Sequence, residues 1–251
     1  MAPDSFSPAA VASDNMAKLF AGTSGFSYLA WKPGFYPASV PAKAFLRHYA
    51  TRLPAVEINY TYHRLPSAST LEGWLNETPP GFVFVLKAHM RITHVHRLAP
   101  SSFNQAFFQA IDPLRVNGRL GPVLFQLPPQ MPLDLPRLEG FLADVPPGVR
   151  CAFEFRNKSW LTGAVYDCLE SKGVALCLAE SDKLVIPHRV TADFVYFRLR
   201  KSEYPPEDRA EIARKVRLLL ADGKDVYVFF KHEETPAGAL HAEELMREAA
   251  L

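Results

Sequence analysis

The chain has 251 residues, of which 48% are hydrophobic and 22% are charged, and its formal net charge is +2. This composition is typical of a folded globular protein and excludes extensive disorder. No apolar run reaches the roughly 18 residues of a transmembrane helix. The small net charge gives no reason of its own to expect nucleic-acid binding.

The N-terminal segment lacks both the basic stretch and the continuous apolar stretch of a signal peptide. We therefore expect a flexible extension over residues 1–17 and one folded domain over residues 18–251. Within this domain, short runs rich in β-branched and aromatic residues alternate with patterns typical of helices. Strands are predicted at 19–23, 55–59, 82–87, 122–126, 151–156, 174–179, 194–199 and 226–231. Helices are predicted at 41–53, 67–77, 103–117, 135–143, 160–171, 207–221 and 237–250, with Ser67 and Ser159 as N-caps of two of them.

Only residues 180–192, which connect the predicted strands at 174–179 and 194–199, show no convincing helical pattern. The alternation predicts parallel strands joined by right-handed crossovers. Eight units of about 29 residues each match the size of a (β/α)8 TIM barrel. The alternative is a doubly wound open sheet, which usually carries a G-x-G-x-x-G phosphate turn, and this motif is absent. We therefore predict an α/β fold of the single-domain (β/α)8 TIM-barrel class, with no cofactor.

The three cysteines, Cys151, Cys168 and Cys177, are odd in number and lack C-x-x-C spacing. This pattern argues against a disulfide framework or a structural zinc site and favours a reducing compartment. We therefore expect a cytoplasmic protein without membrane association.

Polar side chains gather near the carboxyl ends of the predicted strands, where TIM-barrel enzymes hold their sites. Period-2 alternation turns the following residues toward the barrel interior: Glu57, Asn59, Lys87, Gln126, Glu154, Arg156, Tyr196, Arg198, Arg200 and Lys231. Five of them are cations and two are carboxylates, so the mouth concentrates positive charge. Because arginine matches phosphate and carboxylate geometry, this surplus predicts a small anionic ligand.

Proton transfer in this mouth is assigned to Glu57, Glu154, Lys87 and His94 as candidate catalytic residues. A lysine surrounded by other cations has a lowered pKa and can act as a base, which also keeps Lys231 in consideration. The alternative is that Glu57 and Glu154 pair with two of the cations and only hold the scaffold.

Five aromatic residues follow the first strand within eleven positions: Phe26, Tyr28, Trp31, Phe35 and Tyr36. Aromatic side chains at this density can stack on a sugar or a base, or can pack the loop onto the barrel rim. We favour packing for most of them and keep Tyr28, Trp31 and the later Trp160 as candidate ligand contacts.

His94 and His96 form an H-x-H pair, a spacing that can place two imidazoles on one metal ion. No third ligand has a diagnostic spacing, and the nearby cations would repel a divalent ion. We therefore predict no metal site.

Six motifs in chain order resemble the DUF72 (YecE-like) family: GTSGFSYLAWKPGFYP, VEINYTYHRLP, LKAHMRITHVHRL, LFQLPP, FEFRNKSW and VYVFFKHEE. The resemblance covers about residues 20–247 and implies a TIM-barrel fold without assigning a reaction. It implies importance for Gly22, Ser24, Glu57, Asn59, Tyr62, Lys87, His94, Gln126, Glu154, Arg156 and Trp160. Arg200-Lys201 and Lys231-His232 stand where many family members have His-Gly and paired asparagines, which makes this mouth more basic.

The leading hypothesis is an enzyme that acts on a phosphorylated sugar or a nucleotide through hydrolysis, isomerisation or lyase chemistry. Its ligand-binding residues are predicted to be Ser24, Tyr28, Trp31, Asn59, Tyr62, Gln126, Arg156, Trp160, Arg198, Arg200 and Lys231. A second hypothesis is a nucleic-acid binding or processing protein, which steep salt dependence would favour. A third is a non-catalytic ligand-binding module, which tight binding without turnover would favour.

Overall fold

The computed structural model describes residues 16–231 and 233–249. The predicted extension therefore lies almost wholly outside the described residues. All eight predicted strands are present, within one or two residues of the expected bounds: β1 (Leu19–Thr23), β2 (Ala55–Ile58), β3 (Val83–Leu86), β4 (Val123–Gln126), β5 (Cys151–Glu154), β6 (Ala175–Ala179), β7 (Phe194–Leu199) and β8 (Asp225–Phe230).

The seven predicted helices are also present: α1 (Phe45–Ala50), α2 (Ala68–Glu77), α3 (Ser102–Val116), α4 (Leu135–Ala143), α5 (Gly163–Ser171), α6 (Pro206–Ala221) and α7 (Ala237–Ala249). Ser67 is the N-cap of α2, because its side chain accepts a hydrogen bond from the Thr70 amide. The prediction of Ser159 as an N-cap is wrong. Residues Lys158–Trp160 form a separate 3-10 turn, and Thr162 caps α5 instead.

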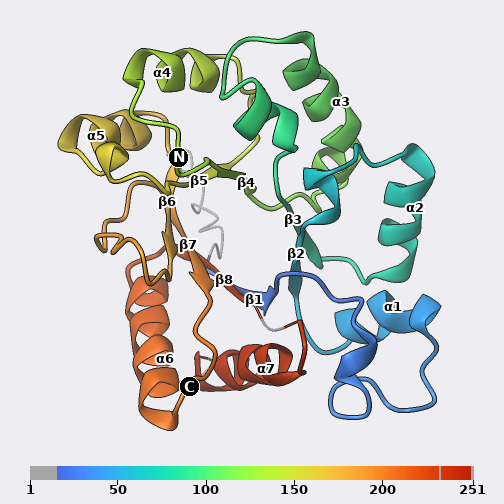
Figure 1. The fold of residues 1–251 in the computed structure, drawn as a ribbon. Coiled ribbons are helices and arrows are strands. Elements are labelled where there is room, and N and C mark those ends of the chain that lie inside the picture. Colours follow the sequence, from blue (N-terminus) through green and yellow to red (C-terminus); the bar gives the residue numbers. More distant parts are fainter. Residues whose placement is uncertain (1–15, 232, 250–251) are drawn as a thin grey trace, which may run out of the picture.

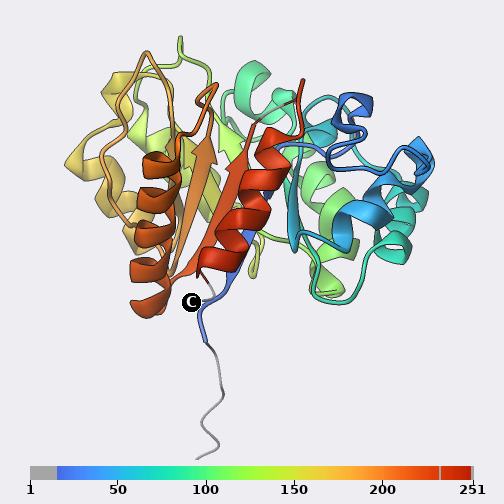
Figure 2. The ribbon, with the colours of Figure 1, turned by 90° about the horizontal axis from the view of Figure 1, so that it is seen from below.

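Every strand pair is parallel, as the alternation predicts. Six strands form one sheet in the order β1-β8-β7-β6-β5-β4, and β2 pairs with β3 in a second sheet. Figure 1 shows the strands curved around a common interior with the helices on the outside. In Figure 2 the strand arrows run in one direction, and α6 lies beside α7 over the sheet.

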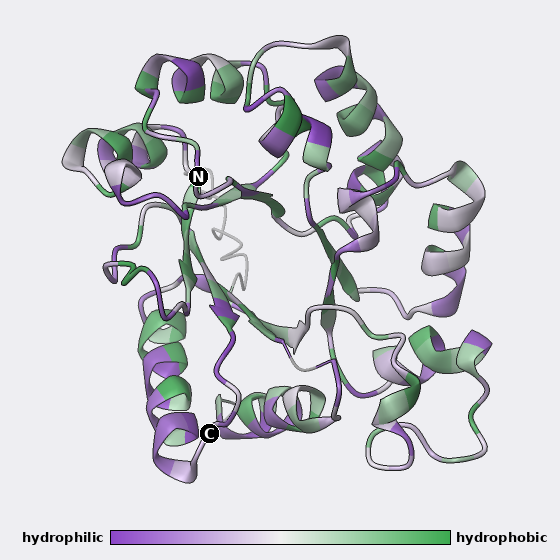
Figure 3. Ribbon diagram, viewed as in Figure 1, coloured by the Kyte–Doolittle hydropathy of each residue, from purple (hydrophilic) through white to green (hydrophobic). Residues whose placement is uncertain are grey.

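Alternate strand residues belong to two separate apolar layers, because successive side chains of a strand point to opposite faces. The inner layer includes Val85, Leu124 and Phe229, whereas their sequence neighbours pack under the helices in the outer layer. Both faces of the strands are therefore buried, and Figure 3 shows largely hydrophobic strands beside helices of mixed character. Polar residues of the inner face lie at the strand ends, where this inner layer stops.

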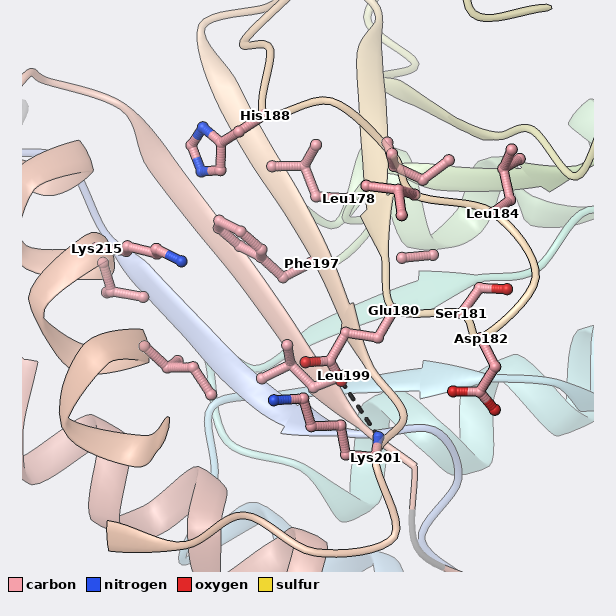
Figure 4. A pocket seen from close by; sticks show the side chains of 15 residues that line it. Leu178, Glu180, Ser181, Asp182, Leu184, His188, Phe197, Leu199, Lys201 and Lys215 are labelled. Carbon is pink, nitrogen blue, oxygen red and sulfur yellow. Dashed lines mark hydrogen bonds between the residues drawn. The ribbon is translucent and has the colours of Figure 1, made fainter. Parts of the chain in front are cut away.

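The connection between β6 and β7 contains no helix, in agreement with the sequence pattern over 180–192. Its residues, all of them described, instead form an extended segment beside the outer face of the sheet. A pocket of about 360 Å³ lies between this segment, Phe197 of β7 and Lys215 of α6 (Figure 4). The missing helix thus leaves this part of the outer face less covered than the rest.

Candidate functional site

Arg198, near the end of β7, lies between two carboxylates of the inner face. Its Nε and Nη2 donate to the two carboxylate oxygens of Glu57 at 2.8 and 2.6 Å, and its Nη1 donates to Glu154 at 2.5 Å. Glu57 belongs to β2 and Glu154 ends β5, so one guanidinium joins side chains from both sheets. The exposed fractions of Glu57, Arg198 and Glu154 are 0%, 2% and 3%. Such a buried cluster persists only because each charge is paired.

Neighbouring side chains occupy further acceptor positions of both carboxylates. The hydroxyls of Ser24 and Tyr196 each donate to Glu57 at 2.7 Å. Gln126 Nε2 and Arg156 Nε donate to Glu154 at 2.8 and 2.9 Å. The alternation of β7 already turns Tyr196 inward, so this contact could have been anticipated from the sequence.

These contacts control the ionisation of the two carboxylates. Burial raises the pKa of Glu57, but the charge of Arg198 and the hydrogen bonds outweigh it, and the pKa lies below its ordinary value. Burial likewise raises the pKa of Glu154, but Arg198, Arg200 and Arg156 lower it to about 2. Both groups therefore stay ionised near neutral pH and hold the arginines in place.

Lys87 directly follows β3 and is half-buried beside this cluster. Its Nζ lies 4.2 Å from the ring centroid of Tyr62. Among the described residues, this amine forms neither an ion pair nor a hydrogen bond. Burial and the positive charge of Arg198 lower the pKa of Lys87 to about 8, against the opposing effect of the two carboxylates. A substantial fraction of this amine is therefore neutral at slightly alkaline pH.

His94 follows on a turn of π-helix that spans Arg91–Val95. Its ring centroid lies 5.4 Å from that of Tyr62, and its Nδ1 lies 2.9 Å from the Thr93 hydroxyl. Burial, together with the charges of Lys87 and Arg156, lowers the pKa of His94, which favours the neutral imidazole. The sequence gives no periodic signal for a π-turn, although such turns are frequent at functional sites.

Two strained residues end this segment. Arg97 and Leu98 have φ values of 49° and 66°, a left-handed conformation that costs energy for residues other than glycine. The buried side chain of Leu98 anchors the strained turn in the outer core. The end of the segment that carries His94 is therefore fixed by packing.

A cavity of about 380 Å³ adjoins the cluster at the carboxyl ends of β5, β6 and β7. Arg156 and Arg200 line it together with Glu154 and residues 179–184. Arg156 is 40% exposed, and Arg200 Nε is a buried donor with no hydrogen-bond partner within the described chain. The backbone amide of Arg200 donates to Glu180 at 2.6 Å, which fixes the base of the side chain. Two arginines thus present donors to one recess.

No group of three or more histidine, cysteine or acidic side chains in the described part of the chain has an arrangement suited to a metal ion. The three cysteines are buried and free. None of the described helices has the length and apolar character that a membrane span requires.

A family model described as a protein of unknown function, DUF72, matches residues 20–251. The chain belongs to the DUF72 family. This result confirms the resemblance inferred from the six motifs.

This DUF72 protein is similar in sequence or in fold to three known proteins. The UPF0759 protein YunF of Bacillus subtilis strain 168 is 29% identical over 143 residues, which cover 53% of this chain and 49% of that protein. The alignment thus spans about half of the Bacillus relative. The structure of a DUF72 family protein from Thermotoga maritima MSB8 has a TM-score of 0.80 at 27% identity, and covers 93% of this chain and 100% of its own. A DUF72 structure from Enterococcus faecalis V583 shares the fold, with a TM-score of 0.73 at 19% identity and coverages of 94% and 98%.

Gly22, one of the residues that the DUF72 resemblance marks, lies where β1 approaches β2. A Cβ atom at this position would lie 2.0 Å from the carbonyl oxygen of Ala55 and 2.8 Å from the Tyr49 hydroxyl. Only glycine permits this approach. Gly22 therefore has a structural role that brings Ser24 within reach of Glu57.

The prediction that Trp31 and Trp160 contact a ligand is wrong for this DUF72 protein. Both side chains have an exposed fraction of 0%. Trp160 stacks on Phe155 at a centroid distance of 4.9 Å, and its Nε1 donates to the Met131 carbonyl at 2.8 Å. Trp31 stacks on Tyr36. Both side chains therefore pack in the protein interior, which is the alternative to ligand contact that the sequence offers for these aromatic residues.

The remaining predicted ligand-binding residues are at least partly exposed. Tyr28 is partly exposed, and its hydroxyl donates to the Ser24 carbonyl at 2.9 Å. Asn59 is half-buried at the start of the turn Tyr60–Tyr62. Lys231 directly follows β8, its side chain is 44% exposed, and its Nζ lies 3.6 Å from the Glu233 carboxylate.

Proposed function

We propose that this DUF72 protein is an enzyme that acts on a small anionic molecule by general acid–base chemistry. The observation that carries the proposal is the unpaired amine of Lys87 beside a recess with unused arginine donors. Arg198 and Arg156 together balance the charges of Glu57 and Glu154. In the lining of the recess, Glu180 and Asp182 are matched by Lys183 and Lys201, so Lys87 and Arg200 leave the mouth positive. A phosphate or carboxylate group is the ligand that two arginine side chains recognise best.

Lys87 is assigned the proton transfer in this proposal, and His94 acts as its relay. A pKa of about 8 suits an amine that gains and loses protons near neutral pH. Glu57 and Glu154 fit that role less well, because their arginine contacts keep both carboxylates ionised. We therefore assign them to positioning Arg198 and Arg156.

We also infer that the two sheets close into one (β/α)8 barrel, which brings these residues around a single mouth. Support comes from backbone contacts at both seams. The Gly25 amide donates to the Glu57 carbonyl at 2.8 Å between the ends of β1 and β2. The Ala88 amide donates to the Leu124 carbonyl at 2.9 Å between the ends of β3 and β4. We keep the cytoplasm as the proposed location because the three cysteines are free.

A ligand screen by thermal shift tests the anion site. Sugar phosphates, nucleotides, dicarboxylates and short oligonucleotides are added to the full chain. A ligand at 100 times its Kd stabilises the protein by about 2.7 kcal/mol, which raises the Tm measurably. We expect phosphorylated small molecules to give this shift, and Arg156→Ala and Arg200→Ala to abolish it.

Arg115→Ala is the matched control, because Arg115 pairs with Asp112 on the surface of α3, away from the recess. It should retain the full shift. If no anion raises the Tm, or if Arg156→Ala and Arg200→Ala respond like Arg115→Ala, the anion site does not exist. Binding confined to oligonucleotides, with a steep salt dependence, would replace the proposal by nucleic-acid recognition.

A further inference from the structure

The side-chain amine of Lys87 is in a position that suits a nucleophile, because no nearby carboxylate of the described chain pairs with it. The nearby carboxylates of Glu57 and Glu154 bond to Arg198 and do not capture it. Its described neighbour is the face of the Tyr62 ring, which holds a cation by electrostatic attraction and accepts no covalent bond. The lone pair of the neutral amine is therefore free to attack an electrophile.

The backbone on both sides of this amine is firmly held. The Lys87 amide donates to the Ile58 carbonyl at 3.0 Å, and the Lys87 carbonyl accepts from the Thr61 hydroxyl at 2.7 Å. The next amide, that of Ala88, donates to Leu124 across the seam. A reactive group on such a rigid element loses little freedom when substrate binds, which favours reaction.

The recess with Arg156 and Arg200 supplies a binding group, and these arginines, like Lys87, follow the carboxyl ends of parallel strands. Arg156 lies near enough to Lys87 and His94 to lower the pKa of both. An anionic group bound by the two arginines would hold the rest of a small molecule against the amine. The electrophile that an amine attacks reversibly in such a pocket is a carbonyl carbon.

We infer that Lys87 forms an imine with a small aldehyde or ketone whose anionic group is bound by Arg156 and Arg200. This inference rests on the proposed anion site and gives its substrate class. The Nζ lone pair forms a bond to the carbonyl carbon, and the C=O π electrons move to oxygen, which takes a proton. That proton comes from the nitrogen and gives a carbinolamine. The hydroxyl then takes a second proton and leaves as water while the nitrogen lone pair forms the C=N bond, and the iminium nitrogen gives up its remaining proton. His94 relays these protons, and no oxidant or reductant is required.

Borohydride trapping tests the imine on the full chain with pyridoxal 5′-phosphate, an aldehyde that carries a phosphate. Borohydride reduces the C=N bond to a stable secondary amine, and peptide mass spectrometry locates it. We expect Lys87 to be labelled about tenfold faster than the exposed Lys172, because burial and the charge of Arg198 lower the pKa of Lys87 to about 8 and thereby favour its neutral, nucleophilic amine. The labelling rate should rise with pH through a midpoint near 8.

Two variants and one analogue serve as controls. Lys87→Met keeps an unbranched side chain without the amine and should lose the fast label, whereas Lys172→Met should retain it. Pyridoxine 5′-phosphate carries an alcohol in place of the aldehyde, so it tests the anion site without an imine. If it raises the Tm while Lys87 stays unlabelled, the imine is refuted and the anion site stands. If it gives no shift and labelling is uniform over the lysines, both proposals fail.

Discussion

The guanidinium of Arg198 sets the roles of its neighbours because it bonds to carboxylates from two different strands. A carboxylate so held is useful for geometry and poor at exchanging protons. Within the described part of the mouth, the Lys87 amine and the Arg200 Nε lack such partners and are available to a ligand. The groups that can react with or bind a ligand are therefore those that the neighbouring ion pairs leave without a partner.

The acid dependence of stability tests the role of Glu154. Its pKa of about 2 in the folded state lies below the ordinary value of 4.5. The ionised group therefore stabilises the fold above about pH 4.5, and this contribution is lost as the pH falls toward 2. The pKa of Glu57 is shifted in the same direction, so both groups weaken the fold in acid.

We expect Glu154→Gln to lower the free energy of unfolding at pH 7 by about 2 kcal/mol, because it removes charged hydrogen bonds. Below pH 4.5 its stability should decline less steeply than that of the native chain. Urea denaturation at a series of pH values measures both effects, with Glu72→Gln, at an exposed position of α2, as the control. A variant that keeps full stability but loses turnover would return Glu154 to proton transfer.

Sequence reasoning anticipated which residues meet at the mouth but not how they pair. Strand alternation alone turns Glu57, Glu154 and Arg198 inward. A shift of one residue would turn the apolar side chains of the outer layer away from the helices, so the face of each residue is well determined. Their pairing depends on how strands distant in sequence are spaced around the interior. The sequence does not settle the role of Trp160, because an aromatic residue near a site gives the same pattern whether its side chain stacks on a ligand or on Phe155.

At the scale of elements, the predictable parts are those with a repeating pattern. Strands and long helices carry a period of 2 or 3.6, and their bounds agree closely with the structure. The π-turn at Arg91–Val95 and the strained pair Arg97-Leu98 have no such period. Nothing in the sequence indicates them, although they shape the segment that carries His94.

The close approach of β1 and β2 can be tested by a substitution at Gly22, where the two strands meet. We expect Gly22→Ala to destabilise the fold by about 3 kcal/mol or more, since the added methyl group would overlap the Ala55 carbonyl. Gly140→Ala in α4 is the control: its methyl group meets nothing within 4 Å, and alanine favours a helix by about 0.5–1 kcal/mol. Denaturation curves compare the two variants. Equal stabilities would show that the approach of β1 to β2 is not tight.

For the whole molecule, the arrangement of two sheets determines whether the site is one surface or two. Glu57 lies in β2 and Lys87 directly follows β3, whereas Glu154 and Arg198 lie in the six-stranded sheet and Arg156 and Arg200 follow its strands β5 and β7. The ion pairs of Arg198 cross between them. Any opening of the seams would therefore separate the proposed nucleophile from the proposed anion site.

Hydrogen exchange of three amides measures this coupling. The amides of Gly25 and Ala88 bond across the two seams, and that of Leu127 bonds to Glu154 within the six-stranded sheet. In a closed barrel the three should exchange with similar protection, because all would need the same large opening. If β2 and β3 open independently, Gly25 and Ala88 will exchange much faster than Leu127. That result would contradict the closed barrel and would mean that the mouth forms only when the two sheets meet.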